Sequence, residues 1–245
     1  MWVCGSNREG QIGLSIIDKV IVPTQIPGLK AKEVSTGESY TAVIDLENNL
    51  WMSGNNQFGQ LGLGDNSNRK VFTPIPIIKA KQVATGISHT VVIDVENNVW
   101  TIGRGVYGQL GLGDNKNRTI PTQINNLKAK QVAAGWNHTV IIDLENNVWT
   151  FGYNGEGQLG LGDKINRNRP TQIPVIKAKQ VAAGGRHTAI IDINNNIWTF
   201  GDNAQGQLGL GDKINRDNPT QIANFKALQI SAGAFHTIML ATLII

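Results

Sequence analysis

The sequence predicts an all-β fold, a β-propeller of four-stranded antiparallel blades, and three observations support this prediction. The tetrapeptide Trp-x-x-Gly recurs every 49 residues, at Trp2, Trp51, Trp100, Trp149 and Trp198. A repeat of about 40 to 50 residues is typical of propellers. Each copy also contains four short segments rich in β-branched or aromatic residues, and no segment has the 3.6-residue apolar period of a helix. Five copies account for all 245 residues, so we expect five blades in a single domain, 1–245.

The third complete copy illustrates the four strands of one unit. The segments 128–135, 138–143, 148–152 and 170–173 are each bounded by Gly, Asn or Pro, which is typical of strand ends. Asn146 lies between the second and third segments, where asparagine tolerates the positive φ of a tight hairpin. We therefore expect four antiparallel strands in each copy, with a tight turn between the second and the third.

The two ends of the chain complement each other in this pattern. The chain begins at a third strand, near Trp2–Cys4, with a fourth strand near Thr24–Ile26, and the last copy diverges after its second strand, at Ala241. We expect these four strands to form one blade, which pairs N-terminal with C-terminal strands and removes two open sheet edges. The alternative is a fragment of a larger propeller, whose open edges would promote association.

The repeated residues resemble a known family. Gly-x-x-His-Thr is followed by an apolar strand, then by Trp-x-x-Gly-x-Asn-x-x-Gly-Gln-Leu-Gly-Leu-Gly-Asp and by Pro-Thr. This pattern resembles the repeat of the regulator of chromosome condensation (RCC1-like) family, over the entire chain and five times. The resemblance implies a propeller, although familiar members usually have seven blades and often longer repeats. It also implies guanine-nucleotide exchange on a small GTPase, for which the family uses an insertion that copies of one fixed length do not contain.

Composition limits the environment and the partners. The net charge is +4 and the isoelectric point is near 9.2, a mild basic bias that permits an acidic partner without requiring one. Cys4 is the single cysteine, so no internal disulfide forms, and we expect a buried structural thiol. No signal-peptide pattern is present. We expect an intracellular protein, cytoplasmic, nuclear or virion-associated, and the abundance of Asn, Ile and Lys suggests an AT-rich viral or bacterial genome.

Residues that recur in every copy are expected to belong to the scaffold. One position holds His89, His138, His187 and His236, with Tyr40 in the first copy. These histidines lack the closely spaced partners of a metal site, so we expect each to hydrogen-bond a neighbouring backbone group. The repeated tryptophans are expected to fill the core between blades, and the aspartates Asp45, Asp94, Asp143 and Asp192 to cap the hairpin. No metal, cofactor or catalytic residue is predicted.

The departures from the repeat predict the binding surface. Alternating strand direction puts the Gly-x-x-His loop and the Gly-x-Asn-x-x-Gly-Gln loop at one end of each blade. Their variable positions collect residue types that are frequent at binding hot spots. The candidate binding residues are Glu38, Ile87, Trp136, Arg186, Phe235, Phe58 and Tyr107. Unconstrained variation of exposed residues is the alternative explanation.

A basic rim is expected at the periphery of the same loops, formed by Arg69, Arg118, Arg167 and Arg216. It would contact nucleic-acid phosphates or an acidic protein, unless nearby aspartates neutralise it in ion pairs. Overall the sequence favours a noncatalytic protein–protein interaction scaffold that does not contact membranes and is monomeric if the ring closes. The alternatives are guanine-nucleotide exchange on a small GTPase and binding to chromatin or nucleic acid.

Overall fold

The computed structural model describes residues 1–15 and 18–243, and all the regular structure in these residues is β-strand. None of them forms a helix long and apolar enough to cross a membrane. The chain divides into two compact units, which are described separately. Unit 1 comprises Met1–Arg104 and Lys116–Asn125, and unit 2 comprises Gly105–Asn115 and Asn126–Ile245.

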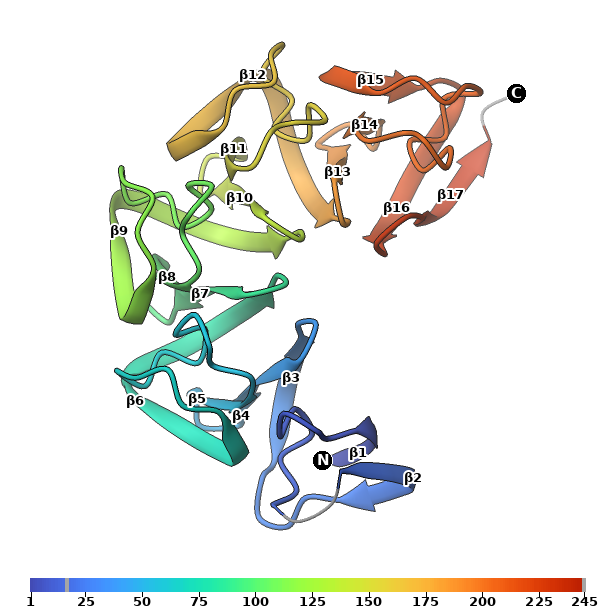
Figure 1. The fold of residues 1–245 in the computed structure, drawn as a ribbon. Coiled ribbons are helices and arrows are strands. Elements are labelled where there is room, and N and C mark those ends of the chain that lie inside the picture. The colour runs from blue at the N-terminus through green and yellow to red at the C-terminus, as the bar shows by residue number, and fades with distance from the viewer. Residues whose placement is uncertain (16–17, 244–245) are drawn as a thin grey trace. The chain divides into compact units, whose positions relative to one another are not determined.

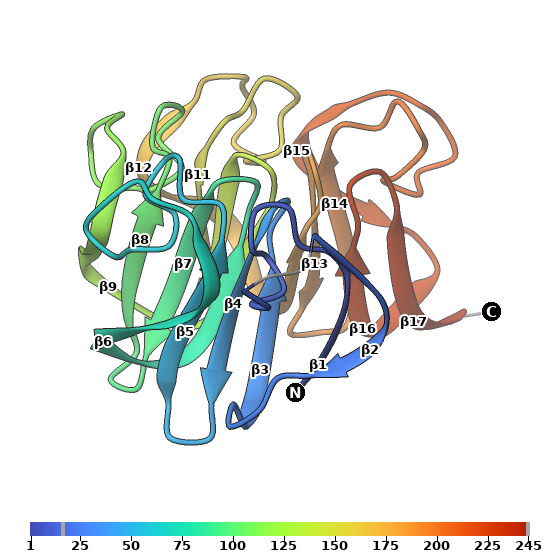
Figure 2. The same cartoon turned by 60° about the horizontal axis from the view of Figure 1, so that its bottom comes forward.

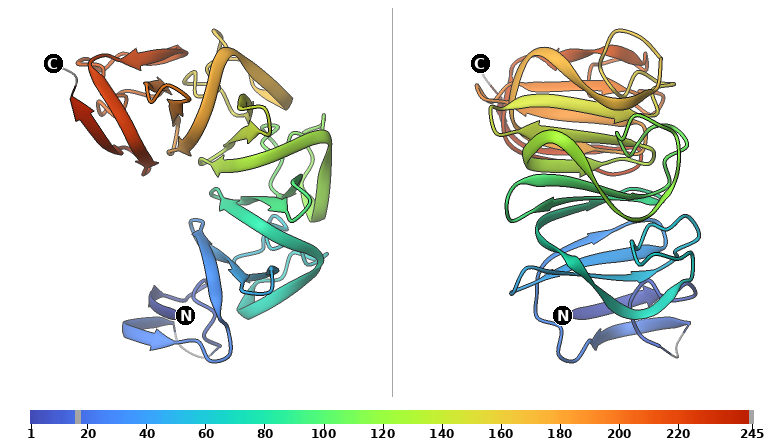
Figure 3. Two further views of the ribbon diagram at one scale, coloured as in Figure 1. Left: turned by 180° about the vertical axis from the view of Figure 1, so that it is seen from behind. Right: turned by 90° about the vertical axis from the view of Figure 1, so that its left-hand side faces the viewer.

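Unit 1 contains a two-stranded sheet and a larger antiparallel array (Figure 1). The small sheet pairs β1 (Trp2–Ser6) with β2 (Lys19–Gln25). In the array, consecutive strands pair in chain order: β3 (Ala31–Thr36), β4 (Tyr40–Asp45), β5 (Asn49–Gly54), β6 (Arg69–Thr85), β7 (His89–Asp94) and β8 (Asn98–Gly103). Figure 3 shows the strands from β3 to β6, blue to teal, side by side in layers.

Unit 2 repeats this arrangement. β9 (Arg118–Ala134) begins in unit 1 and ends in unit 2. It is followed by β10 (His138–Asp143), β11 (Asn147–Gly152), β12 (Arg167–Ala183), β13 (His187–Asp192), β14 (Ile197–Gly201) and β15 (Arg216–Ile222), again paired antiparallel in chain order. The last two strands, β16 (Phe225–Ala232) and β17 (Thr237–Leu243), form a separate two-stranded sheet.

The long strands β6, β9 and β12 were not expected at this length. Each has 17 residues and joins the fourth predicted strand of one copy to the first strand of the next. In β6, residues 69–79 pair with β5 and residues 80–85 pair with β7. The prediction of four antiparallel strands in each group is therefore confirmed, but neighbouring groups share one continuous strand, because no turn interrupts the backbone between them.

The two ends of the strands differ as expected. At one end, tight hairpins place Asn48 and Asn146 at φ of 67° and 69°, and Figure 2 shows the β4–β5 hairpin at the lower end of its strands. At the other end the two longer loops of a copy contact each other, since the Tyr153 amide donates to the Asn137 carbonyl (2.8 Å) and the Asp202 amide to the Arg186 carbonyl (2.8 Å). In unit 1 the Asn55 amide donates to the Ser39 carbonyl in the same way (2.9 Å), so the expected common position of these loops is confirmed within each unit.

The core lies between successive four-strand groups. In unit 1, Tyr40 and Leu50 pack with Ile102 of the following group. In unit 2, Ile142 and Val148 pack with Phe200 in the same way. Every residue of β4, β7 and β13 is buried, because these strands lie in the middle of their groups with side chains covered on both faces. The apolar faces of consecutive groups therefore stabilise one another within each unit.

The expected joint blade of the terminal strands is not confirmed. β1 pairs with β2 and β17 pairs with β16, in separate sheets. The prediction of a buried thiol is wrong, because Cys4 on β1 is exposed. The equivalent residues Ser53 and Phe151 are fully buried, since their strands have hydrogen-bonded neighbours on both sides, whereas β1 has one neighbouring strand.

Candidate protein-binding loop end

The repeated histidines link each group of strands to the next. The Nε2 atoms of His138 and His187 lie 3.1 and 2.9 Å from the hydroxyls of Thr188 and Thr237. The Thr188 hydroxyl donates its own proton to the Gln158 carbonyl (2.8 Å), so the imidazole Nε2–H must be the donor to this hydroxyl. The expected structural role is supported, but the partner is a threonine side chain rather than a backbone group.

Burial keeps the imidazoles of His89 and His187 neutral. Desolvation lowers the pKa of His89 to about 4, and it is also the main reason that the pKa of His187 falls to about 4. Tyr40 occupies the same position in the first copy, and its phenol donates to the backbone carbonyl of His89. Among residues 1–15 and 18–243, no cluster of three or more His, Cys, Asp or Glu side chains is arranged to hold a metal ion. The repeated histidine or tyrosine therefore links each group of strands to the next.

The hairpin aspartates form a second repeated network. One oxygen of Asp143 accepts from the amides of Glu145 and Asn147, at 2.9 and 2.8 Å. Its other oxygen accepts from the Asn147 side-chain amide (2.7 Å) and the Trp149 indole N–H (2.8 Å). Burial alone would raise the pKa of Asp143, but these hydrogen bonds outweigh it and hold the pKa below its usual value. The capping prediction is confirmed. The tryptophans of this network are half-buried, and Trp100 and Trp198 also pack against the core clusters of unit 1 and unit 2, as expected in part.

Variable loop residues form a contiguous cluster in unit 2. Trp136 and Phe235 contact edge to face, with ring centroids 5.3 Å apart and an interplanar angle of 89°. The Arg186 guanidinium carbon lies 5.5 Å from the centre of the Trp136 ring, and its Nη1 lies 3.8 Å from Glu156 Oε1. Phe235 is 50% exposed and the Arg186 side chain 47% exposed. We call Trp136, Arg186, Phe235 and Glu156 the aromatic–arginine cluster.

The backbone supports this cluster. The Trp136 amide donates to the Gly185 carbonyl and the Gly185 amide to the Ala234 carbonyl, both at 3.1 Å. These bonds join equivalent positions of three successive Gly-x-x-His loops. A Cβ atom on Gly185 would lie 2.9 Å from Cε2 of Trp136, so the missing side chain of Gly185 gives the indole its place. The cluster is therefore carried by hydrogen-bonded loops of neighbouring groups.

Other candidate residues lie in smaller clusters. Tyr107 contacts Tyr153 in unit 2, with centroids 5.3 Å apart, and Arg104 lies 4.9 Å from the centre of the Phe58 ring in unit 1. In unit 1 Glu38 is exposed and Ile87 half-buried. Sequence reasoning missed Tyr153, Arg104 and Glu156 as site residues. Their variability among the copies is the signal that would have identified them.

Aspartates engage arginines of the predicted basic rim. Arg69, Arg167 and Arg216 form ion pairs with Asp65, Asp163 and Asp212 at 2.6, 2.5 and 2.5 Å. Arg118 donates to the backbone carbonyls of its neighbours Lys116 and Asn117, both at 3.3 Å. This geometry fits the expected alternative, in which the rim arginines stabilise their own loops.

A family model described as the RCC1-like domain matches residues 1–239. The chain belongs to the RCC1-like domain family. No curated protein sequence matches it.

Solved structures share the fold of this RCC1-like domain at low sequence identity. Human WBSCR16 has a TM-score of 0.87 and 20% identity, over 98% of this chain and 67% of that chain. Prp20p from Saccharomyces cerevisiae has a TM-score of 0.86 and 21% identity, over 100% of this chain and 64% of that chain. Yeast RCC1 (Prp20) bound to Kap60 has a TM-score of 0.83 and 19% identity, over 96% and 59%. The chain thus spans about two thirds or less of the length of these relatives.

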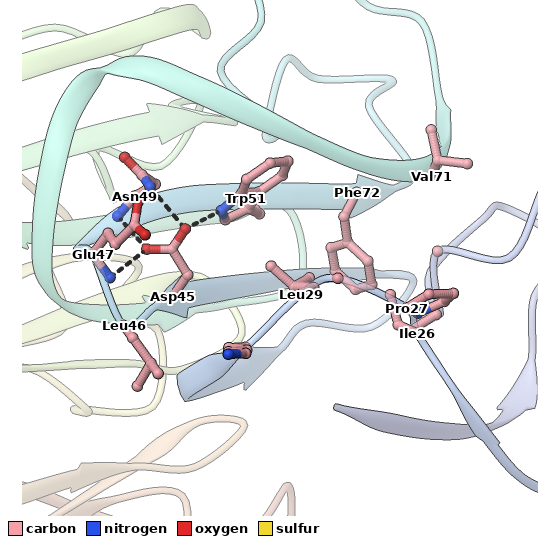
Figure 4. Close-up of a pocket in the computed structure, with 13 residues that line it drawn as sticks. Ile26, Pro27, Leu29, Asp45, Leu46, Glu47, Asn49, Trp51, Val71 and Phe72 are labelled. Carbon is pink, nitrogen blue, oxygen red and sulfur yellow. Dashed lines mark hydrogen bonds between the residues drawn. The ribbon is translucent and has the colours of Figure 1, made fainter.

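Unit 1 of this RCC1-like domain also contains a pocket of about 630 Å³ (Figure 4). Its walls include Leu29, Trp51 and Phe72. Phe72 stands where the other copies have proline, and a Cβ atom on Gly13 would lie 2.3 Å from its ring. Both carboxylate oxygens of Asp45, at the side of the pocket, already accept hydrogen bonds within the hairpin. The pocket therefore borders the scaffold network, whereas the variable residues lie at the loop end.

Proposed function

We propose that this RCC1-like domain is a noncatalytic protein-binding module and that the aromatic–arginine cluster is the centre of its binding surface. The observation that carries the proposal is the contact of Trp136 with both Phe235 and Arg186, on exposed loops where the copies differ. Aromatic and arginine side chains contribute large shares of binding energy when a partner buries them. Similar structures also support a protein partner, since the yeast Prp20p structure is described with binding to Gsp1p and histones and yeast RCC1 is bound to Kap60.

Two other functions remain hypotheses with less support. Nucleotide exchange on a small GTPase is suggested by the family, but all five copies have the same 49-residue length and leave no insertion to act on the GTPase. Nucleic-acid binding would use the rim arginines, and Arg69, Arg167 and Arg216 are already in ion pairs. A labelled-nucleotide release assay tests the first function, and DNA affinity measured at several salt concentrations tests the second.

The main test is affinity capture from the native cell with three forms of the protein. The variant Trp136→Ala/Arg186→Ala/Phe235→Ala should lose the partners that the unchanged protein retains, while its circular-dichroism spectrum stays the same. A matched control changes Leu144 and Ile193 to alanine, because both are aliphatic, 52% exposed and on the hairpins of unit 2. Loss of partners with the control and not with the triple variant would place binding at the hairpin end and refute the proposal.

We also propose that residues 1–245 act as one five-bladed domain in which β1 pairs with β17. In unit 2, Thr188 pairs with Phe200, and the same register one repeat later sets Thr237 opposite Cys4. The unpaired edges support this proposal. Ile238 is 65% exposed, whereas its equivalent Ala189 is fully buried.

A single added cysteine tests this pairing. Thr237→Cys should form a disulfide with Cys4 under mild oxidation, because residues directly opposite in antiparallel strands lie within disulfide range. Ile238→Cys, which is shifted by one residue and points to the other face, is the matched control and should remain reduced. A monomeric disulfide supports closure within one chain, whereas disulfide-linked dimers or the absence of any disulfide contradict it.

A further inference from the structure

We infer that the aromatic–arginine cluster binds an acidic segment of its partner, with a carboxylate on Arg186 and an adjacent apolar side chain on Trp136 and Phe235. This inference rests on the proposed function and specifies the chemistry of the partner at the same surface.

Arg186 is positioned to bind a carboxylate. Its guanidinium lies over the Trp136 ring, and its side chain remains 47% exposed. Contact with an aromatic face orients the plane of a guanidinium while its N–H groups remain directed outward from the plane edge. The 3.8 Å ion pair with Glu156 is longer than a hydrogen bond. A carboxylate that binds Arg186 at hydrogen-bond distance, with two parallel bonds, would therefore interact more strongly than Glu156 does.

Glu156 is held away by a second contact. Its Oε2 atom accepts a hydrogen bond from the side-chain amide of Asn215 at 2.8 Å. This bond joins the loop of Glu156 to the loop before β15. Glu156 therefore competes weakly for Arg186 and leaves the guanidinium partly available.

Exposed lysines on the neighbouring loops also favour an acidic segment, and the nearby Asp202 carboxylate accepts a hydrogen bond from the Ala204 amide (3.0 Å). The carboxylates of Asp163 and Asp212 are engaged by Arg167 and Arg216 at 2.5 Å. Lys164 and Lys213, next to them in sequence, are exposed. Each of these lysines is followed by an isoleucine that is 65% exposed, Ile165 and Ile214. Exposed cations beside exposed apolar groups suit a segment that alternates acidic and apolar residues. A basic segment is disfavoured, because Arg186 already lies over the Trp136 ring.

The test begins with a random library of 12-residue peptides displayed on phage and selected on the full-length protein. The selected peptides should be enriched in Asp or Glu next to Phe, Leu or Trp. The most enriched peptide is then synthesised together with a copy that carries Asn and Gln in place of Asp and Glu, and both are measured by fluorescence polarisation. We expect the neutral copy to bind about tenfold more weakly, since charge-assisted hydrogen bonds are lost.

Three variants test the roles of Arg186 and Glu156. Arg186→Ala should weaken binding of the acidic peptide about tenfold and Arg186→Lys somewhat less, because lysine keeps the charge and loses the planar fork. Glu156→Gln should strengthen binding about threefold, because it removes the competing charge and keeps an oxygen for Asn215. Basic or uncharged selected peptides, no selected peptide, or affinity independent of Arg186 would overturn the inference. If the triple variant loses its cellular partners while the peptides are not acidic, this inference fails and the proposed function stands.

Discussion

The hairpin end and the loop end of the strands obey different rules. At the hairpin end, four copies repeat one network, in which an aspartate accepts from two backbone amides, an asparagine and a tryptophan. At the loop end, the same backbone supports Trp136 in one copy, Gly185 in the next and Ala234 in the last. Repetition therefore marks groups that every copy needs to fold, and the residues proposed to bind a partner lie among those that vary. Substitutions at the two ends of the strands test this contrast.

The largest effect is expected from Gly184→Ala in the Gly-x-x-His loop. An added Cβ would lie 2.2 Å from Cε1 of His187 and 2.6 Å from the Gly233 carbonyl oxygen. The backbone atom cannot move aside without breaking the loop contacts, so we expect a loss of about 3 to 5 kcal/mol in the free energy of unfolding. Urea unfolding of the two proteins measures this difference in unfolding free energy.

Gly206→Ala is the control for this change. No atom lies within 4 Å of the added Cβ, and only the φ of +78° opposes the substitution, so we expect a loss of about 1 kcal/mol. Equal losses in the two variants would contradict a role for Gly184 in seating the imidazole.

The buried histidines predict a loss of stability in weak acid. The pKa values of His89 and His187 fall from 6.5 to about 4 on burial. Above about pH 6.5 both states are neutral and the stability is complete. Below it the unfolded chain binds protons first, so stability falls until about pH 4, by up to about 3 kcal/mol for each histidine.

Unfolding free energies measured between pH 7 and pH 4 test this prediction. His187→Gln keeps an N–H donor near the Thr237 hydroxyl and removes the titrating group, so its stability should depend less steeply on pH than that of the unchanged protein. Identical pH slopes in the two proteins would show that His187 does not contribute. The hairpin aspartates contribute only at the acidic end of this range, since their pKa values are held below the usual value of 3.8 and the unfolded chain begins to bind those protons near about pH 5. That contribution is the same in both proteins.

Asp143→Ala tests the repeated hairpin network directly. It removes the acceptor of four hydrogen bonds, including the one from the Trp149 indole. Because Asp143 is partly exposed, water replaces some of these bonds, and we expect a loss of about 2 kcal/mol. Leu144→Ala, the next residue along the hairpin, is 52% exposed and should change stability by less than about 0.5 kcal/mol.

Most of the fold followed from one repeat, because each copy contains its own turn residues and apolar strands. Contacts between copies were harder to predict. The partner of His138 is Thr188, 50 residues away, and a sequence does not reveal which hydroxyl of the next copy faces the ring. Glu156 was likewise overlooked, since its link to Arg186 joins two loops 30 residues apart. Cys4 looked like a core residue because its equivalents are buried, but burial depends on the neighbouring strand rather than on the position within the repeat.

The smallest effect is expected at the rim. Arg167 pairs with Asp163 at 2.5 Å, with side chains 25% and 32% exposed, and partly exposed pairs contribute little. Arg167→Ala should therefore cost about 0.5 kcal/mol in unfolding free energy, and DNA affinity should not change because the guanidinium is already bound to Asp163.

The double variant Asp163→Asn with Asp212→Asn is the more informative test of the rim, since it releases the two arginines from their ion pairs. It should raise DNA affinity and make that affinity fall more steeply with salt, because each further phosphate that an arginine neutralises releases about one more counterion. If Arg167→Ala alone abolished DNA binding, the rim would be a binding surface and would belong with the variable loops rather than with the scaffold.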